Sequence, residues 1–214
     1  MFVADWMTKK VFTVSPDSSI SDAVKLTKEK GIKHLPVVKG DKIKGLLSDR
    51  DIKEYVPSRA ASFDVFELHS LLAKTKVKSV MKTAIVTTSP DTPIEEAALI
   101  MLDKNIGCLP VLDRNRIVGI ISDRDLFRVL VDISGIRHAG HRIYLPVKDR
   151  PGAIKDISTV IRKHGFSLQS ILTSYEGMKK GQRKLVLRLK GRGNFRTLEA
   201  ELTASYIGVE IKRG

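Results

Sequence analysis

The chain repeats itself once, and this repeat limits the possible folds more than any other feature of the sequence. Residues 45–51, Gly-Leu-Leu-Ser-Asp-Arg-Asp, return 74 positions later as residues 119–125, Gly-Ile-Ile-Ser-Asp-Arg-Asp. The surrounding sequence keeps this offset without a gap, so that Met7 aligns with Met81 and Ile20 with Ile94. Two copies are too few for a solenoid, and the repeat therefore predicts two like modules packed as a pseudo-symmetric pair.

The repeated motif predicts a strand that leads directly into a helix. Its two aliphatic residues end the strand, and its Ser and final Asp have the spacing of a capping box at a helix N-terminus. Gly45 and Gly119 precede the aliphatic pair and allow another backbone or a ligand to come close. A helix N-terminus also attracts phosphate, and a carboxylate one turn into the helix can bind a ribose diol. The spacing leaves the capping and the ligand-binding interpretations both open.

Each copy is expected to contain the same series of elements around the motif. For the first copy we predict a strand over residues 11–14, a turn at 15–17, a helix over 19–30 ended by Gly31, and strands over 35–38 and 43–47. In the second copy, Thr92 as N-cap, Pro93 and Glu95 predict a helix that runs to about Lys104. This helix is more apolar than its counterpart, which predicts deeper burial between the copies or in a dimer.

Residues 54–76 lie between the copies. Their apolar residues recur at helical spacing, which predicts a packed helix that uses Phe63, Phe66, Leu68, Leu71 and Leu72. Residues 56–62, before this helix, are expected to be mobile. His69 on the helix is interpreted as an ordinary surface or core residue.

The remainder of the chain alternates strands and helices. We expect strands over 142–147, 168–175, 184–190 and 209–212, and helices over 152–164 and 195–205. This order is βαββαβ, a ferredoxin-like plan. The predicted fold class is therefore mixed α/β and α+β, divided into repeat 1 (1–62), a linker helix (63–76), repeat 2 (77–133), a linker (134–140) and a C-terminal domain (141–214).

The repeat resembles the tandem CBS (cystathionine-β-synthase) domain pair, a regulatory module that binds adenine nucleotides or related adenosyl ligands. Both copies carry the Gly, the two aliphatic residues, the Ser and the Asp, and both have a Met before the first strand, a Ser-Pro turn and a Leu-Pro-Val strand. The resemblance covers about residues 1–133. It implies that Asp51 and Asp125 hold ribose hydroxyls and that Ser48 and Ser122 lie beside the phosphate or ribose.

The resemblance also implies two clefts, each with Ser and Asp from one copy and an adenine-contacting wall from the other. The expected wall of the Asp51 cleft consists of Ile85, Val86, Gly107, Cys108 and Pro110. The expected wall of the Asp125 cleft consists of Val11, Phe12, Lys33, His34 and Pro36. Because Lys33 and His34 would bring positive charge to the phosphates, we expect the Asp125 cleft to bind a polyphosphate better. Arg50 and Arg124 either reach phosphate or pair with Asp49 and Asp123.

The C-terminal region resembles the ACT domain over about residues 141–212. The sequences Asp-Arg-Pro-Gly-Ala-Ile at 149–154 and Gly-Phe-Ser-Leu at 165–168 carry the resemblance. ACT domains are regulatory modules that often bind amino acids at a dimer interface, which implies a possible amino-acid site at Asp149, Arg150, Pro151, Gly152, Ala153 and Ser167. Many members have Asn in place of Ser167, so a purely dimerising role is an equal alternative. A CBS pair followed by an ACT domain is similar to the acetoin-utilization protein family.

The positive charge of the chain is concentrated in its C-terminal third. Residues 139–214 contain 16 Lys and Arg against 6 Asp and Glu, whereas residues 1–138 contain 22 against 18. A dense basic stretch lies along the predicted hairpin and just beyond it. It consists of Lys179, Lys180, Arg183, Lys184, Arg188, Lys190, Arg192 and Arg196. A solvated face is the usual explanation for such a stretch. Nucleic acid or another polyanion is the alternative partner, although no helix-turn-helix or zinc finger is present.

The sequence contains no recognisable catalytic motif. It lacks Cys-x-x-Cys, His-Glu-x-x-His, Gly-x-Ser-x-Gly and a P-loop lysine, and the repeated Ser has no neighbouring base. Cys108 is the only cysteine and is expected to be buried and unreactive. No signal peptide or membrane-spanning run is evident, which predicts a cytoplasmic protein.

We therefore predict a non-catalytic allosteric regulator, with no metal and no required cofactor, that senses an adenine nucleotide through its repeats. A homodimer is the expected assembly, and the regulated target is not identified by the sequence. The alternative function is a regulator that binds nucleic acid or another polyanion through the basic C-terminal hairpin.

Overall fold

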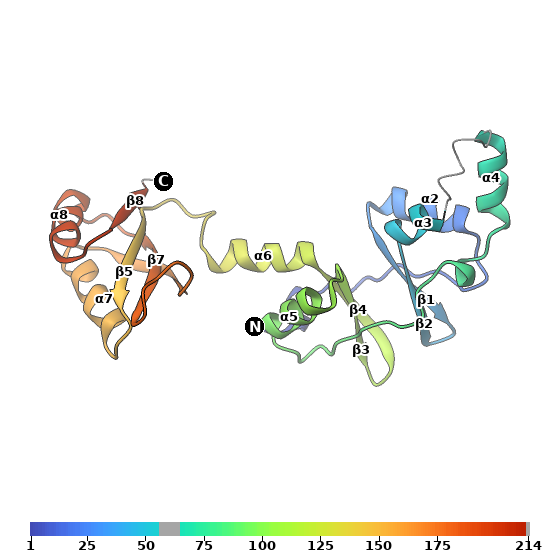
Figure 1. Ribbon diagram of the computed structural model, residues 1–214, viewed down its shortest axis with the longest axis horizontal. Coiled ribbons are helices and arrows are strands. Elements are labelled where there is room, and N and C mark those ends of the chain that lie inside the picture. The colour runs from blue at the N-terminus through green and yellow to red at the C-terminus, as the bar shows by residue number, and fades with distance from the viewer. Residues whose placement is uncertain (56–64, 213–214) are drawn as a thin grey trace. The chain divides into compact units, whose positions relative to one another are not determined.

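The computed structural model describes residues 1–55 and 65–212 and divides the chain into two compact units, Met1–Leu126 and Phe127–Gly214. Figure 1 traces both units along the chain. The predictions for Phe63 and for residues 56–62 lie outside the described residues.

The first repeat has the elements that its sequence predicts, with one exception. It contains the helices α1 (Val3–Trp6), α2 (Ile20–Lys30) and α3 (Asp49–Tyr55) and the antiparallel strands β1 (His34–Lys39) and β2 (Lys42–Ser48). Ser19 caps α2 through its side chain, and Gly31 ends this helix in the left-handed conformation. The predicted strand at 11–14 is wrong, because only Val14 forms a bridge, with Val37. Val14 bonds to the Pro36 oxygen and the Val38 N–H, and extension of this ladder toward residue 12 would need an N–H that Pro36 lacks.

The second repeat has the same arrangement. It contains α4 (Val65–Lys74), a short 3-10 helix η2 (Val77–Ser79), α5 (Ile94–Lys104), the antiparallel strands β3 (Cys108–Asp113) and β4 (Arg116–Ser122), and α6 (Asp123–Ile133). The strand registers match at the 74-residue offset, since His34 pairs with Ser48 and Cys108 with Ser122. The predicted pseudo-symmetry is therefore confirmed.

Two details of α5 differ from the prediction. The helix begins at Ile94 with Pro93 as its N-cap, and the Thr92 hydroxyl oxygen accepts a hydrogen bond from the Thr88 hydroxyl instead of capping the helix. Ile94, Ala97 and Met101 are buried, but Leu99 and Leu102 are 55% and 77% exposed within the unit. The apolar character of this helix therefore does not reflect burial between the copies.

The predicted linker helix exists as α4, but it packs only in part. Leu72 contacts the core of the first repeat, whereas Phe66 is 81% exposed. His69 is exposed, in keeping with an ordinary surface residue.

The segment in front of each repeat packs against the other repeat. The Val3 N–H donates to the Thr92 oxygen, and the Val77 N–H donates to the Ser18 oxygen, each at 2.9 Å. Both valines are fully buried. Thr8 pairs with Ile120 and Lys82 pairs with Leu46 in the same way. Residues 3–8 thus pack on the second repeat and residues 77–82 on the first, and we call these two stretches the exchanged segments. Their exchange joins the two repeats and brings Lys82 close to the first motif.

The second unit has the predicted ferredoxin-like order. Its elements are β5 (Arg142–Lys148), α7 (Ala153–Lys163), β6 (Ser167–Ser174), β7 (Gln182–Lys190), α8 (Phe195–Ser205) and β8 (Glu210–Lys212), and the antiparallel sheet has the order β6-β7-β5-β8. Both helices cover one face of this sheet (Figure 1). Apolar side chains of the helices and of β5 and β7 form the core there: Ile143, Leu145, Val147, Ile157, Ile161, Leu185, Leu187, Leu189, Leu198 and Leu202.

Gly45 allows the exchange to occur, and this role can be tested. A Cβ at position 45 would lie 2.7 Å from the Lys82 backbone oxygen, whereas a Cβ at Gly119 would meet the flexible side chain of Met7. We expect Gly45→Ala to destabilise the protein by about 1–3 kcal/mol through overpacking, and Gly119→Ala to destabilise it less. Urea unfolding of both variants measures the difference. Equal stabilities, or a less stable Gly119→Ala protein, would contradict the assigned backbone contact.

Candidate functional site

The two motifs have almost the same hydrogen bonds in the two repeats. Ser48 donates to Asp51 Oδ2 through both its N–H (2.8 Å) and its hydroxyl (2.5 Å), and the Asp51 N–H donates back to Ser48 Oγ at 3.1 Å. In the second repeat Ser122 donates to Asp125 Oδ2 at 3.0 and 2.8 Å. Asp51 and Asp125 are both buried. The capping interpretation therefore holds, and it fixes the orientation of both carboxylates.

Asp51 has a second partner, which comes from the exchanged segment. Lys82 Nζ lies 3.0 Å from Asp51 Oδ1, the carboxylate oxygen that Ser48 leaves available. Burial opposes ionisation of Asp51, but the hydrogen bonds from Ser48 and Lys82 outweigh this effect and lower the pKa of the carboxyl. Asp51 is thus held as an anion at neutral pH.

A cavity of about 300 Å³ opens beside Asp51, within the first unit. The first repeat contributes most of its polar lining, and the second contributes an aliphatic wall. The lining residues are Lys33, His34, Leu46, Ser48, Asp49, Arg50, Asp51, Lys82, Ala84, Ile85, Val86, Asn105, Ile106, Gly107 and Cys108.

The structure brings together most residues predicted for the Asp51 cleft. Ser48, Arg50, Ile85, Val86 and Cys108 all line the cavity with Asp51. Pro110 does not line this cavity and is instead buried in β3, where its oxygen accepts the Thr88 N–H.

Lys33 and His34, which the sequence predicted for the wall of the Asp125 cleft, both line the cavity that contains Asp51. The reason is strand register: His34 pairs with Ser48, and the Lys33 oxygen accepts the Asp49 N–H. The start of β1 therefore lies beside the motif of its own repeat. His34 also lies near the second motif, because the charge of Asp123 acts on its ring together with that of Asp51. The contribution of Lys33 and His34 to the Asp125 cleft stays a prediction.

The other residues predicted for the Asp125 wall belong to the first repeat as well. Phe12 packs against the core of that repeat, with Lys10 and Lys30 over its ring at 6.0 and 5.3 Å. Pro36 is buried in β1, and Val11 is half-buried. Their proposed contact with a ligand remains a prediction.

The two arginines of the motifs do not form the predicted ion pairs. Arg50 Nε donates to Glu54 at 2.7 Å, one turn further along α3, while Lys53 pairs with Asp49. The bond between Asp123 and Arg124 comes from the Arg124 backbone N–H, at 2.6 Å. Helical spacing explains the choice of Glu54, because residues four apart lie on the same helix face.

His34 and Cys108 occupy equivalent positions in the two repeats. Burial lowers the pKa of His34, despite the opposing charges of Asp123 and Asp51, so this ring is neutral at pH 7. Burial, helped by the charges of Asp123 and Asp51, raises the pKa of the Cys108 thiol to about 12. The cavity is therefore lined here by a neutral imidazole and a neutral thiol.

Some residues that line the cavity were not predicted from the sequence: Leu46, Lys82, Ala84, Asn105 and Ile106. A signal for Lys82 was present in the sequence, because the equivalent residue of the first repeat is Thr8. A charged residue in one repeat and a neutral residue in the other mark a position where the two clefts differ. The aliphatic residues and Asn105 carry no such signal.

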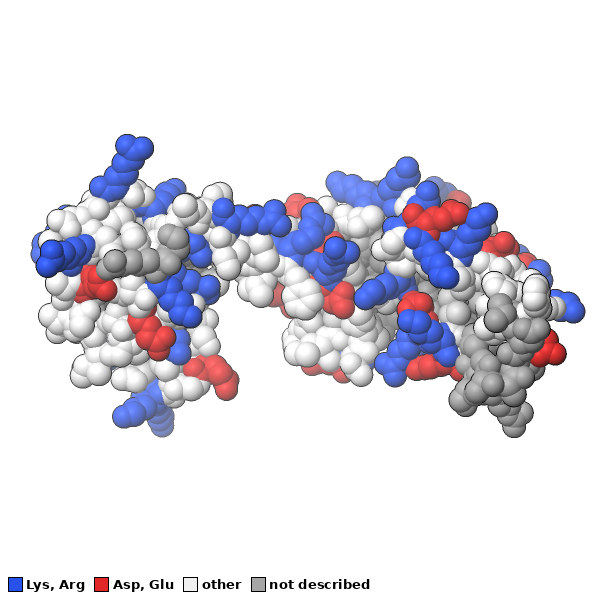
Figure 2. All heavy atoms as spheres, turned by 90° about the horizontal axis from the view of Figure 1, so that it is seen from above, with Lys and Arg blue, Asp and Glu red and all other residues white. Residues whose placement is uncertain are grey.

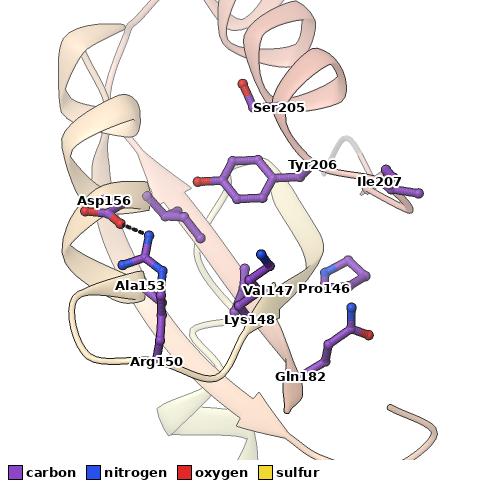
Figure 3. Close-up of a pocket in the computed structure, with 11 residues that line it drawn as sticks. Pro146, Val147, Lys148, Arg150, Ala153, Asp156, Gln182, Ser205, Tyr206 and Ile207 are labelled. Atoms are coloured by element: carbon purple, nitrogen blue, oxygen red, sulfur yellow. Dashed lines mark hydrogen bonds and ion pairs between the residues drawn. The ribbon is translucent and has the colours of Figure 1, made fainter. Parts of the chain in front are cut away.

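A second cavity of about 290 Å³ lies in the C-terminal unit, between the end of β5, the start of α7 and the end of α8 (Figure 3). Arg150 and Ala153 line it, but Asp149, Pro151, Gly152 and Ser167 do not. Arg150 Nη2 lies 2.6 Å from Asp156, and the Tyr206 hydroxyl points toward this pair in Figure 3. Burial and the charge of Asp156 raise the pKa of Tyr206, although Arg150 opposes the shift. Only part of the predicted amino-acid site therefore reaches a cavity.

The described residues form no helix that is both long and apolar enough to cross a membrane.

Comparison with known proteins gives a family match to both repeats. The family model of the CBS domain matches residues 3–58 and 77–132. The CBS domain-containing protein YhcV of Bacillus subtilis is 35% identical over 124 residues, which cover 58% of this chain and 81% of YhcV. Homoserine O-acetyltransferase of Methanohalobium evestigatum is 32% identical over 131 residues, but the match covers only 24% of that enzyme.

Solved structures agree with this match. The putative acetoin utilization protein AcuB of Vibrio cholerae has a TM-score of 0.53 at 29% identity, covering 64% of this chain and 95% of AcuB. The CBS domain pair of protein MJ0100, solved with 5′-methylthioadenosine and S-adenosyl-L-methionine, has a TM-score of 0.52 at 27% identity, covering 62% of this chain and 97% of that pair.

The chemistry of Cys108 provides a test of the cavity. Its burial and raised pKa predict that a thiol reagent at pH 8 labels the native protein at least about a hundredfold more slowly than the protein unfolded in guanidinium. Because Cys108 is the only cysteine, absorbance of the released thiolate reports this position alone. Native labelling within tenfold of the unfolded rate would contradict the described environment.

Proposed function

The chain belongs to the CBS domain family, and on this premise we propose that it is a non-catalytic regulatory protein that senses an adenine nucleotide in the Asp51 cavity. Ligand binding would bridge the two repeats and favour one arrangement of them. The regulated protein would respond to that arrangement.

The composition of the cavity is the observation that carries the proposal. Its volume of about 300 Å³ lies at the lower end of the range for small-molecule sites. Ile85, Val86 and Ile106 form an aliphatic wall suited to the flat face of adenine. Asp51, held as an anion by Ser48, is suited to accept the two hydroxyls of a ribose. Lys33, Arg50 and Lys82 add positive charge for a phosphate.

Lys82 links the ribose and phosphate contacts. Without ligand its ammonium group occupies Asp51 Oδ1, the atom that a ribose hydroxyl would need. A nucleotide with a phosphate offers Lys82 a new anionic partner, so the lysine can leave Asp51 without losing its ion pair. Adenosine would have to displace the same lysine without offering a replacement. We therefore expect nucleotides to bind more tightly than nucleosides.

The charges also favour a nucleotide over S-adenosylmethionine. Lys33, Arg50 and Lys82 exceed the two acids of the lining, Asp49 and Asp51, by one positive charge. The sulfonium and ammonium groups of S-adenosylmethionine would be repelled by this excess. The MJ0100 pair was solved with S-adenosyl-L-methionine, which shows that a CBS pair can hold that ligand. The proposed preference for a nucleotide therefore rests on Lys33, Arg50 and Lys82 of this chain and not on the fold.

The Asp125 cleft is proposed to bind phosphate less well. The repeat places Thr8 where the first motif meets Lys82, so the position equivalent to Lys82 carries no charge in this cleft. This proposal reverses the preference drawn from the sequence.

Two substitutions separate the phosphate and ribose contacts. Lys82→Gln should lower the affinity for AMP by about tenfold through loss of a charge-assisted contact, and should leave the affinity for adenosine unchanged or higher. Asp51→Asn should lower the affinity for adenosine by about tenfold or more, since the charged acceptor is lost. Isothermal titration calorimetry measures all four affinities.

The matched control is Lys78→Gln, because Lys78 has the same charge and pairs with Asp17 at 2.8 Å. Its affinities should equal those of the unmodified protein. An equal loss of AMP and adenosine affinity in Lys82→Gln would refute the phosphate contact. Absence of binding by AMP, ADP, ATP and S-adenosylmethionine alike would refute the adenine-nucleotide sensor itself.

We also propose that the protein is a homodimer and that its C-terminal unit is an ACT-like domain. The ferredoxin-like sheet order and the motif at 149–154 support the ACT-like assignment. Such a domain would hold the dimer or respond to a second small ligand, for which the cavity of Arg150 and Asp156 offers opposite charges. Leu99 and Leu102 form an exposed aliphatic pair on α5 that a second copy would cover.

Light scattering after size exclusion distinguishes the two ways of holding the dimer. The unmodified protein should have about twice the 23.8 kDa mass of one chain. If α5 forms the interface, Leu99→Gln/Leu102→Gln should halve this mass, because the buried apolar contact is lost. The control Ile207→Gln replaces an aliphatic residue that is 97% exposed in the other unit. A dimeric double variant would assign dimerisation to the ACT-like domain, and a monomeric unmodified protein would contradict the dimer.

A further inference from the structure

The C-terminal sheet has one face without helices, and strand alternation identifies its side chains. Ile143, Leu145 and Val147 of β5 and Leu185, Leu187 and Leu189 of β7 point into the core. Because successive side chains alternate, the intervening residues lie on the opposite face, here called the open face. It carries Arg142, Tyr144 and Pro146 from β5, Lys184, Val186 and Arg188 from β7, Ser170, Leu172 and Ser174 from β6, and Glu210 and Lys212 from β8.

The strand register arranges these residues in rows across the sheet. One row is Ser170, Arg188, Arg142 and Lys212, which places three cations side by side. The next row is Leu172, Val186, Tyr144 and Glu210, and the row beyond it includes Lys184. A mostly apolar row with one aromatic ring therefore lies between positively charged rows. In the described strands, Glu210 is the only acid at these positions.

Tyr144 and its neighbouring cations already interact. The guanidinium of Arg142 lies 5.0 Å from the centre of the Tyr144 ring, and Lys212 Nζ lies 5.9 Å from it. These distances are within the range of cation–π contacts. The half-buried ring is thus on the open face and lies beside two flexible cationic side chains, which can move aside for another group.

Arg188 differs from the other cations because it is fixed in place. It is only 7% exposed, and its Nη1 donates to the His138 oxygen at 2.9 Å. The segment after α6 covers it, with Gly135 against its side chain and the Ser134 oxygen bonded to Ser170. Among the described residues Arg188 forms no ion pair, and its Nε has no hydrogen-bond partner. A buried guanidinium without an acidic partner is costly, and a nearby anion would offset that cost.

The basic stretch seen in the sequence therefore divides into separate groups. Arg183 is on the core side of β7 and pairs with Asp149 at 3.4 Å, so it does not belong to the open face. Lys184 and Arg188 do, and they join Arg142 and Lys212, which lie far from them in the sequence. Lys and Arg side chains are visible on the surface of both units in Figure 2, so charge alone does not distinguish the open face. Its combination of aligned cations with Tyr144 does.

We infer that the open face binds single-stranded nucleic acid. Arg142 and Lys212 can contact the phosphates of one strand, with the buried Arg188 adding its charge beside them, and Tyr144 with Val186 and Leu172 provides a surface on which a base can stack. A second copy of the same face is a poor partner, because a two-fold interface would place like charges opposite each other. A duplex is also a poor partner. Four strands span about 14 Å, more than the roughly 12 Å width of the major groove.

Binding of labelled 12-residue oligo(U) and oligo(dT) to the full chain tests this inference, with fluorescence anisotropy as the readout. Arg142→Gln/Lys212→Gln should weaken binding and reduce the slope of log affinity against log salt by about 1.4, since two phosphate contacts are lost. Tyr144→Ala should weaken binding by about tenfold through loss of stacking, whereas Tyr144→Phe keeps the ring and should bind like the unmodified protein.

The control is Lys155→Gln/Arg162→Gln, which removes the same charge from exposed positions of α7, on the helix side of the sheet. It should leave the salt slope and affinity unchanged. Equal weakening by the two double variants would overturn the inference in favour of diffuse attraction to a polyanion. The inference would also be overturned if duplex or heparin competed as well as the single-stranded oligonucleotide. Binding to anionic vesicles in place of oligonucleotides, or no binding at about 100 µM, would overturn it too. Thermal unfolding of every variant checks that the fold is retained.

Discussion

The close contact between Gly45 and the backbone of Lys82 is the interaction on which the candidate site depends. A side chain on Gly45 would prevent the paired hydrogen bonds between Leu46 and Lys82, each 2.9 Å long. Those bonds hold a segment of the second repeat against the strand that ends in the first motif. Lys82 then reaches Asp51, whose orientation Ser48 has already set. The cavity is therefore a product of contact between repeats, and neither repeat alone contains it.

The same exchange explains how a symmetric backbone produces unequal clefts. The strand registers and the cap geometry are nearly identical in the two repeats, so the backbone offers two equivalent positions. The side chains differ at two pairs of equivalent positions. Lys82 corresponds to Thr8 in the exchanged segments, and Cys108 corresponds to His34 at the start of β3 and β1. A lysine that contributes to only one cleft changes its charge without altering the fold. The repeat thus accounts for the shared architecture, and the few side chains that differ account for the proposed difference in ligand preference.

The features that the sequence predicted correctly are those set by neighbours along the chain. The capping pairs at Ser48 and Ser122, the end of α2 at Gly31 and the alternation of the C-terminal strands depend on local spacing, and all are present. The failures depend on distant contacts. Lys82, which the motifs did not indicate, reaches the first cavity through the exchange between repeats, and the strand predicted at 11–14 fails because Pro36 of β1 has no N–H to pair with it. The apolar residues of α5 predicted burial, but periodicity does not distinguish a core from an interface with another molecule.

The positive charge of the C-terminal unit shows why composition needs a structure before it can indicate a partner. Arg183 is used in an ion pair on the core side, and Arg188 is buried under the segment that follows α6. The remaining cations of the open face come from strands far apart in the sequence, so no stretch of sequence displays the row that they form. A four-stranded sheet with both helices on one side leaves its other face without helices, and in this unit the segment after α6 covers only the part around Arg188 and Ser170. What covers that face is decided by its chemistry, and aligned cations around a tyrosine favour an anionic, stackable partner over another apolar surface.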